Sequence, residues 1–206
     1  MGNPLFDPCD LDGLLAQPPP AKKVKRTWVH ASLPGIKPEI AADHEIMKRW
    51  RHDIHMHPEL GFEELRTSDL VAKLLRTWGV EVTVGAFGGP TAVIGVLKGK
   101  MSSDRCIGLR ADMDALPTQE VTSNDYKSTR DGSHHGCGHD GHTTMLLGAA
   151  KYLAATRNFS GTVTFLFQYD SAALEPSSIA RPRLQPASAP LPTPPMRSAP
   201  LRQQAE

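Results

Sequence analysis

A short segment of the sequence, residues 134–142, gathers side chains that bind metals. It contains four histidines, one cysteine, one aspartate and three glycines. Cys137 and His139 are separated only by Gly138, and a glycine there lets the backbone bend without a Cβ clash, so that a thiolate and an imidazole can face one divalent ion. We therefore predict that Cys137 and His139 are metal ligands. The alternative is a surface loop with chance histidines and a small buried cysteine.

The kind of metal site is indicated by what the ligand set lacks. A closed structural zinc site usually takes two ligand pairs separated along the chain. The three cysteines are Cys9, Cys106 and Cys137, and no second cysteine pair exists. An incomplete set favours a catalytic ion whose other ligands lie elsewhere, with a structural zinc site as the alternative. His135 and His142 flank the predicted ligands and are candidates to support them by hydrogen bonds.

Two aspartates form a second group of candidate site residues. Asp112 and Asp114 follow the apolar run Cys106–Leu109, which we expect to be a central strand with Cys106 in the core. Open α/β sheets place their sites at the carboxyl ends of strands. We therefore expect both aspartates at such a site, pointing alternately toward and away from its crevice. An ordinary turn after a strand is the alternative.

The pair His55 and His57 also has a spacing found among metal ligands. It stands at the expected end of a helix, beside Pro58. A structural role is therefore the favoured interpretation of this pair, with metal binding as the alternative.

Helices are predicted where apolar residues recur with the period of a helix face. Ile46, Trp50 and Ile54 recur every four residues and predict a helix that ends near Pro58. A second helix, capped by Thr67 or Ser68 and stopped by Gly79, is predicted by a longer apolar stripe. That stripe consists of Leu70, Val71, Leu74, Leu75 and Trp78. A third helix is expected over residues 143–156.

Strands are predicted where apolar and polar residues alternate. Val80, Val82 and Val84 indicate a half-buried strand, and a turn over residues 85–90 leads into a second one over residues 91–97. A last strand is expected over residues 161–168, where Val163, Phe165 and Phe167 alternate with other side chains. The stretch 116–141 has no clear period and is expected to be a long ordered loop. Helices that alternate with short strands predict a layered α/β domain.

The ends of the chain differ in composition from its middle. Residues 1–39 are rich in proline and lack apolar periodicity, which predicts a disordered leader. From residue 169 the sequence is again rich in proline, and we expect a disordered tail over 169–206. The folded domain is therefore predicted over residues 40–168. A proline-rich end that binds a partner is an alternative interpretation of the tail.

The overall composition excludes several classes of partner. Lys and Arg total 23 against 22 Asp and Glu, and the net charge of +1 gives no field that would steer the protein to nucleic acid or anionic lipid. No apolar run approaches the ~18 residues of a membrane span. Three cysteines cannot form a paired disulfide framework, which favours a reducing compartment such as the cytoplasm.

Four blocks of the sequence, in order, resemble one protein family. They are Trp50–Glu64, Gly108–Pro117, His135–His142 and Gly161–Gln168. These blocks are similar to the hippurate hydrolase and indole-acetyl-amino-acid hydrolase branch of the aminoacylase and carboxypeptidase metallopeptidases. The resemblance covers roughly residues 40–168 and implies an incomplete, layered, zinc-peptidase-like catalytic domain.

The resemblance also implies a chemistry for the candidate residues. Cys137 and His139 would be ligands of a centre with two divalent ions, and Asp114 would orient a ligand or the bridging water. Thiolate and imidazole ligands favour zinc, whereas carboxylate-rich partners favour manganese or cobalt. The substrates would be small N-acyl amino acids, whose amide bond is hydrolysed. Members of the family are often homo-oligomers assembled through a lid domain, which this chain lacks.

The sequence departs from the family after Gln168. The family continues there with Pro-Ala-Glu-Glu, in which one glutamate is the general base and the other a metal ligand, whereas this chain has Tyr169-Asp170-Ser171-Ala172. We therefore expect the chain to lack hydrolytic activity. A truncated or frameshifted remnant that binds metal weakly, or an interaction protein that acts through its proline-rich ends, are the alternatives.

Overall fold

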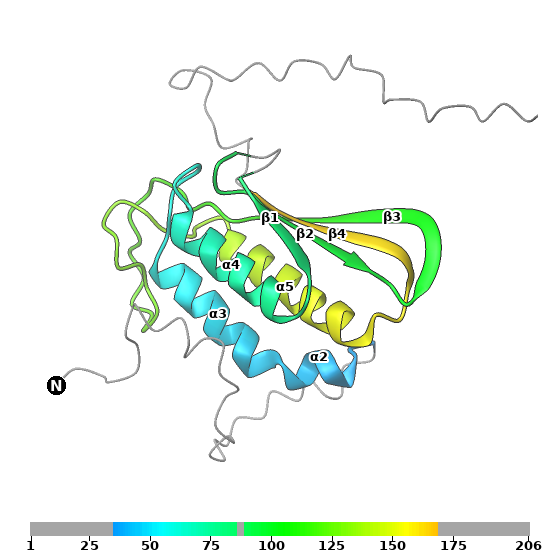
Figure 1. Ribbon diagram of the computed structural model, residues 1–206. Coiled ribbons are helices and arrows are strands. Elements are labelled where there is room, and N and C mark those ends of the chain that lie inside the picture. Colours follow the sequence, from blue (N-terminus) through cyan, green and yellow to red (C-terminus); the bar gives the residue numbers. More distant parts are fainter. Residues whose placement is uncertain (1–34, 86–88, 169–206) are drawn as a thin grey trace, which may run out of the picture. The chain divides into compact units, whose positions relative to one another are not determined.

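Helices and strands alternate through the part of the chain that the computed structural model describes, residues 35–85 and 89–168. The elements in chain order are α2 (Pro38–Ala42), α3 (His44–Met56), α4 (Leu65–Thr77), β1 (Glu81–Val84), β2 (Val93–Lys98), β3 (Met101–Asp112), α5 (His139–Thr156) and β4 (Ser160–Gln168). The predicted mixed α/β class is therefore confirmed (Figure 1). The predicted tail and most of the predicted leader lie outside the described residues. No helix in the described ranges is long and apolar enough to cross a membrane.

The four strands form one sheet in the order β1-β2-β4-β3. Strand β4 pairs antiparallel with β2 and parallel with β3. Among the described strands β3 is thus at the edge of the sheet, so the predicted central position of Cys106–Leu109 is wrong. Cys106 is exposed instead of lying in the core, because no described element covers it there. Its Sγ contacts only the Thr164 hydroxyl of the neighbouring strand among the recorded hydrogen bonds, at 3.6 Å.

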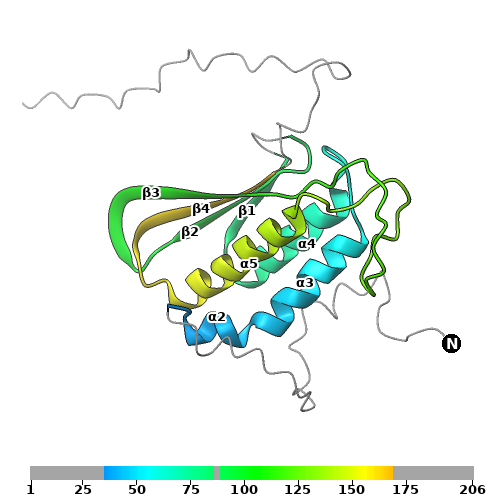
Figure 2. The same ribbon diagram turned by 180° about the vertical axis from the view of Figure 1, so that it is seen from behind.

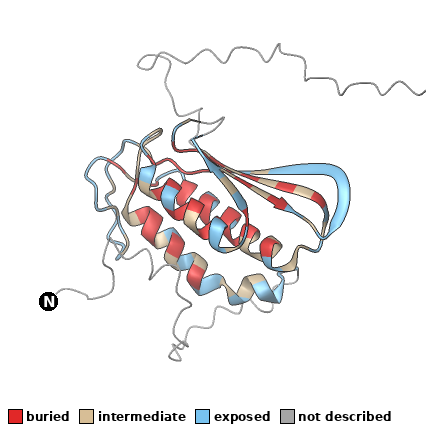
Figure 3. Cartoon of the chain, in the orientation of Figure 1, coloured by how far each residue is buried: buried red, intermediate tan, exposed pale blue. Residues whose placement is uncertain are grey.

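The helices pack on one face of this sheet (Figures 1 and 2). Helix α4 contacts β1 and β2, α5 contacts β3 and β4, and α3 packs against α5. The predicted apolar face of α3 is confirmed, since Ile46, Trp50 and Ile54 are all buried. The predicted alternation in β4 is confirmed as well, because Phe165 and its apolar neighbours two residues away face the helices and are buried. Figure 3 shows these buried positions in red between the helices and the sheet.

Helix α4 begins earlier than its predicted caps. Thr67 and Ser68 lie inside the helix and are buried, so neither is the N-cap. The carboxylate of Glu59 takes over this function: it accepts the backbone N–H groups of Arg66 at 2.9 Å and of Thr67 at 2.8 Å, and also the Thr67 hydroxyl at 2.8 Å. These donors have no partner within the helix. The predicted stop is confirmed by Gly79, which has the left-handed φ of 73°.

Helix α5 also begins before its predicted start. It extends from His139, whereas residues up to 141 were expected to form a loop. Gly138, with a φ of 83°, turns the chain into the helix. His139 and His142 are thus three residues apart on the first turn of one helix, where side chains with this spacing face the same side.

Candidate metal centre

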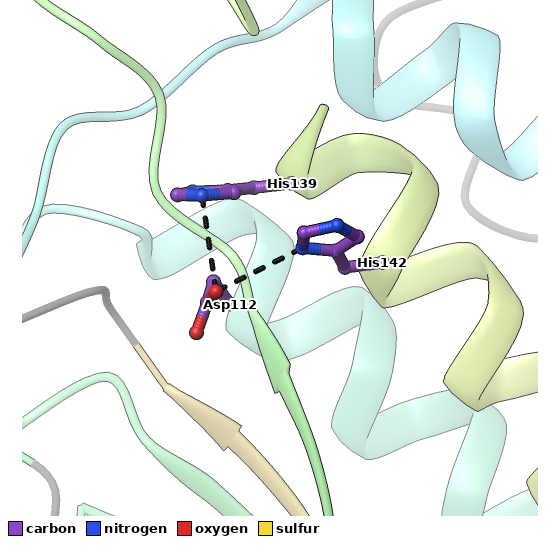
Figure 4. A group of neighbouring side chains, drawn as sticks. All are labelled: Asp112, His139 and His142. Atoms are coloured by element: carbon purple, nitrogen blue, oxygen red, sulfur yellow. Dashed lines mark ion pairs between the residues drawn. The ribbon is translucent and has the colours of Figure 1, made fainter. Parts of the chain in front are cut away.

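Three side chains meet where β3 ends and α5 begins. They are Asp112, at the last position of β3, and His139 and His142 from the first turn of α5 (Figure 4). Asp112 Oδ2 lies 3.8 Å from His139 Nε2 and 3.8 Å from His142 Nδ1. Asp112 and His139 are buried, and His142 is exposed. The group therefore has a buried base and one side open to solvent.

Packing between the strand and the helix fixes this arrangement. Asp112 pairs with Gln168 in the parallel β3–β4 ladder, and the next residue, Met113, donates its N–H to the Gln168 carbonyl at 2.8 Å. Thr143, on the first turn of α5, donates its hydroxyl to the Asp112 carbonyl at 2.9 Å. The carboxyl end of β3 and the start of α5 are thereby held together.

The spacing of the three ligand atoms fits a divalent cation. All three atoms lie within 4.8 Å of one another. Ligand bonds to zinc are about 2.0–2.2 Å, so two atoms bound to one ion lie at most about 4.4 Å apart. The distances of 3.8 Å from Asp112 are inside this limit. One carboxylate and two imidazoles are also a ligand set that zinc accepts in catalytic sites.

Asp114 holds the opposite side of the His139 ring. His139 Nδ1 lies 2.9 Å from the Asp114 carbonyl oxygen and 3.2 Å from its carboxylate Oδ1. Asp112 and Asp114 therefore meet the two nitrogens of one imidazole, and both are buried. A hydrogen bond at Nδ1 leaves Nε2 available to an ion, which is the usual support of a metal-binding histidine.

Cys137 lies outside this group of three. Its side chain is exposed and forms no disulfide. Among the described residues, the recorded group of metal-ligating side chains consists of Asp112, His139 and His142. The thiolate as a ligand therefore stays a prediction, while two residues that were expected only to support the ligands lie directly beside His139 Nε2.

His135 is enclosed beneath the same loop. Its side chain is 4% exposed, and neither ring nitrogen has a hydrogen-bond partner in the described part of the chain. Burial lowers the pKa of His135 from its ordinary value of 6.5 to about 4, although the charge of Asp140 acts in the opposite direction. The ring is thus neutral at pH 7 and lies beside His55, with the two ring centroids 6.1 Å apart.

The structure adds a carboxylate that the sequence reasoning did not single out. Asp140 is fully buried directly after His139, and its Oδ2 lies 2.9 Å from His55 Nδ1 and 3.1 Å from Arg51 Nε. Burial alone would raise the pKa of Asp140, but the His55 hydrogen bond and the charges of His135 and Arg51 lower it below its usual value. Its place inside the histidine-rich segment was the one signal in the sequence.

Comparisons with known proteins support the resemblance found in the sequence. Residues 108–170 match the model of peptidase family M20/M25/M40. The chain is 54% identical over 131 residues to hippurate hydrolase of Campylobacter jejuni, which covers 64% of this chain and 33% of that protein. It is 46% identical over 125 residues to IAA-amino acid hydrolase ILR1-like 2 of Arabidopsis thaliana, covering 59% of this chain and 27% of that protein. The chain thus spans about a third of these curated relatives.

Solved structures agree with this relationship. The YXEP protein of Bacillus subtilis, described as a dinuclear metal binding peptidase from the M20 family, is 38% identical with a TM-score of 0.58, over 62% of this chain and 35% of that one. A putative aminohydrolase of Staphylococcus aureus is 32% identical with a TM-score of 0.60, over 64% of this chain and 33% of that one. The predicted resemblance is confirmed: the chain carries the N-terminal part of a fold of peptidase family M20/M25/M40, in the branch of the hippurate and IAA-amino acid hydrolases.

Proposed function

We propose that this chain carries one part of the metal centre of an amidohydrolase that acts on N-acyl amino acids. The observation that carries the proposal is the arrangement around His139, with Asp112 and His142 on its Nε2 side and Asp114 on its Nδ1 side. Relatives named for hippurate and for N-acyl-L-amino acids support the substrate class. A reducing compartment such as the cytoplasm would suit the free thiols of Cys106 and Cys137.

Each residue has a defined role in this proposal. His139 binds a divalent ion through Nε2, and Asp114 fixes the orientation of its ring. Asp112 and His142 are near enough to bind the same ion, and Cys137 supplies the thiolate that the family resemblance implies. A divalent zinc, manganese or cobalt ion at this position would polarise an amide carbonyl and lower the pKa of a bound water.

We further propose that the 206-residue chain binds the ion without turning substrate over. The positions at which the family carries its paired glutamates hold Tyr169, Asp170, Ser171 and Ala172, and these lie outside the described residues. Loss of a general base typically lowers a rate by about 10²- to 10⁴-fold. Ligands that the family supplies from later in the chain would be needed to hold a second ion.

The test is metal binding by the purified chain. Cobalt is titrated in, because thiolate coordination to cobalt gives a charge-transfer absorption band in the near ultraviolet, and zinc affinity is then measured by competition. His139→Ala is expected to abolish binding, and Cys137→Ala to remove the thiolate band. His44→Ala, an exposed histidine at the start of α3, is the control. Binding that is unchanged in His139→Ala would contradict the proposal.

A further inference from the structure

The segment between β3 and α5 contains an excursion that is closed at its base. Leu116 and His134 form an antiparallel bridge, with Leu116 N 3.0 Å from His134 O and His134 N 3.1 Å from Leu116 O. Residues 117–133 therefore leave the site and return to it at one point. The chain then continues directly into the histidine-rich segment, so the position of the excursion affects the segment that carries the ligands.

The excursion is attached to the end of α3. Thr129 donates its N–H to the Met56 carbonyl at 2.9 Å, and Arg130 donates to the Pro58 carbonyl at 3.0 Å. Tyr126 stacks on His52 of α3, with the ring centroids 3.7 Å apart and the planes 13° from parallel. These contacts place the excursion over the C-terminal turns of α3, where His55 is located.

Glu120 is the buried contact between the excursion and His55. Its side chain is 3% exposed, and its Oε1 lies 3.3 Å from His55 Nε2. The other oxygen accepts the Ser128 N–H at 2.6 Å, and the Thr122 hydroxyl also donates to this carboxylate. Burial alone would raise the pKa of Glu120, but these hydrogen bonds lower it to about 2. The carboxylate thus orders the excursion from within and joins it to α3.

His55 connects this carboxylate to the metal site. One ring nitrogen contacts Glu120 in the excursion, and the other lies 2.9 Å from Asp140. Asp140 is the second residue of α5, between the two histidines that face Asp112. The His55 imidazole therefore bridges two buried carboxylates that belong to separate parts of the chain.

We propose that His55 is a positioning residue for the metal site, which couples cation binding at His139 to the order of the excursion 117–133. It fixes Asp140, and with it the first turn of α5, against the excursion. This inference rests on the proposed metal site, and it assigns to His55 a role beyond that of an ordinary helix-end histidine. His57, two residues later, bonds instead to the Asp53 carbonyl of its own helix at 2.8 Å.

The two histidines provide a matched test. His55→Gln and His57→Gln are compared with the unchanged chain by zinc and cobalt affinity, at a temperature at which circular dichroism shows each variant folded. Loss of a partner that supports a metal ligand typically weakens metal binding by about 10- to 100-fold. Because His55 acts through Asp140, we expect about tenfold weaker binding in His55→Gln. His57→Gln is expected to stay within about twofold of the unchanged chain.

Hydrogen exchange adds a readout that a merely stabilising contact would not change. Added zinc is expected to slow exchange of the Ser128 and Thr129 amides in the unchanged chain and in His57→Gln. This protection is expected to be lost in His55→Gln. If His55→Gln does not fold, Glu120→Gln breaks the same connection from its exterior end and is judged by the same criteria.

The outcomes separate this inference from the proposed function. If the unchanged chain binds zinc and folded His55→Gln binds it equally well, with the same zinc-dependent protection, the role of His55 is overturned and the metal site stands. If the unchanged chain binds neither zinc nor cobalt, both proposals are overturned. Weaker binding in His55→Gln together with lost protection supports the coupling.

Discussion

The His139 imidazole is held through Nδ1 by two oxygens of Asp114, one at 2.9 Å from the backbone and one at 3.2 Å from the carboxylate. The same ring points Nε2 toward Asp112. One aspartate thus fixes the orientation of the imidazole, and the other helps to form the position that a cation would occupy. The order Asp-Met-Asp in the sequence supplies both, because the strand ends between them.

Asp114→Asn is expected to weaken zinc binding by about tenfold while the fold is kept. The amide oxygen can still accept a hydrogen bond from His139, but the negative charge that strengthens the ligand is lost. Competition with a chromophoric chelator measures the affinity. Asp104→Asn, on the exposed part of β3, is the control and should bind zinc as the unchanged chain does. Equal affinity in the two variants would remove Asp114 from the site.

His135 is expected to make the fold sensitive to mild acid. Its folded-state pKa of about 4 lies below the ordinary value of 6.5, so the unfolded chain binds the proton more readily. The stability that this group contributes is fully present above pH 6.5 and is lost as pH falls toward 4. Each unit of pKa shift corresponds to ~1.4 kcal/mol, which gives a loss of about 3 kcal/mol.

Urea unfolding between pH 4 and pH 7.5 measures this effect. His135→Leu replaces a neutral, buried ring with an apolar side chain and should flatten the dependence of the unfolding free energy on pH over that range. The exposed His44→Gln serves as the comparison and should keep the slope of the unchanged chain. An identical slope in His135→Leu would show that another group causes the acid sensitivity.

Glu59→Ala is expected to destabilise the domain by about 2 kcal/mol. The substitution removes the acceptor of three hydrogen bonds at the start of α4, and loss of a helix cap typically costs ~0.5–2 kcal/mol. Thermal or chemical unfolding gives the magnitude. The exposed Glu63→Ala nearby should change stability by less than about 0.5 kcal/mol. A loss of similar size in both variants would argue against the cap.

The chain is expected not to hydrolyse hippurate or other N-acyl amino acids with added zinc, manganese or cobalt. The residues after Gln168 lack the glutamates that the family uses as base and ligand. Release of the free amine is assayed with and without a chelator, beside Cys137→Ala. Turnover that the chelator stops and that is absent in Cys137→Ala would show that the chain builds a complete site from other residues.

Several features followed from the sequence alone because their causes are local. The four-residue recurrence of Ile46, Trp50 and Ile54 specified a buried helix face, and all three are buried. The alternation around Phe165 specified a strand with one buried face. The spacing of Cys137 and His139 around Gly138 identified a metal-binding segment, because ligand chemistry depends on residue type and on short-range backbone freedom.

The tertiary structure decided the partners of these residues. His139 meets Asp114 across 25 positions of sequence, and Asp140 meets His55 across 85. Such contacts depend on how β3, α3 and α5 pack, and no local period encodes them. The edge position of β3 and the exposure of Cys106 were missed for the same reason, since a short apolar run looks alike in a central strand and an edge strand. Sequence therefore determined which side chains could bind a metal, whereas packing between distant elements determined which of them lie together.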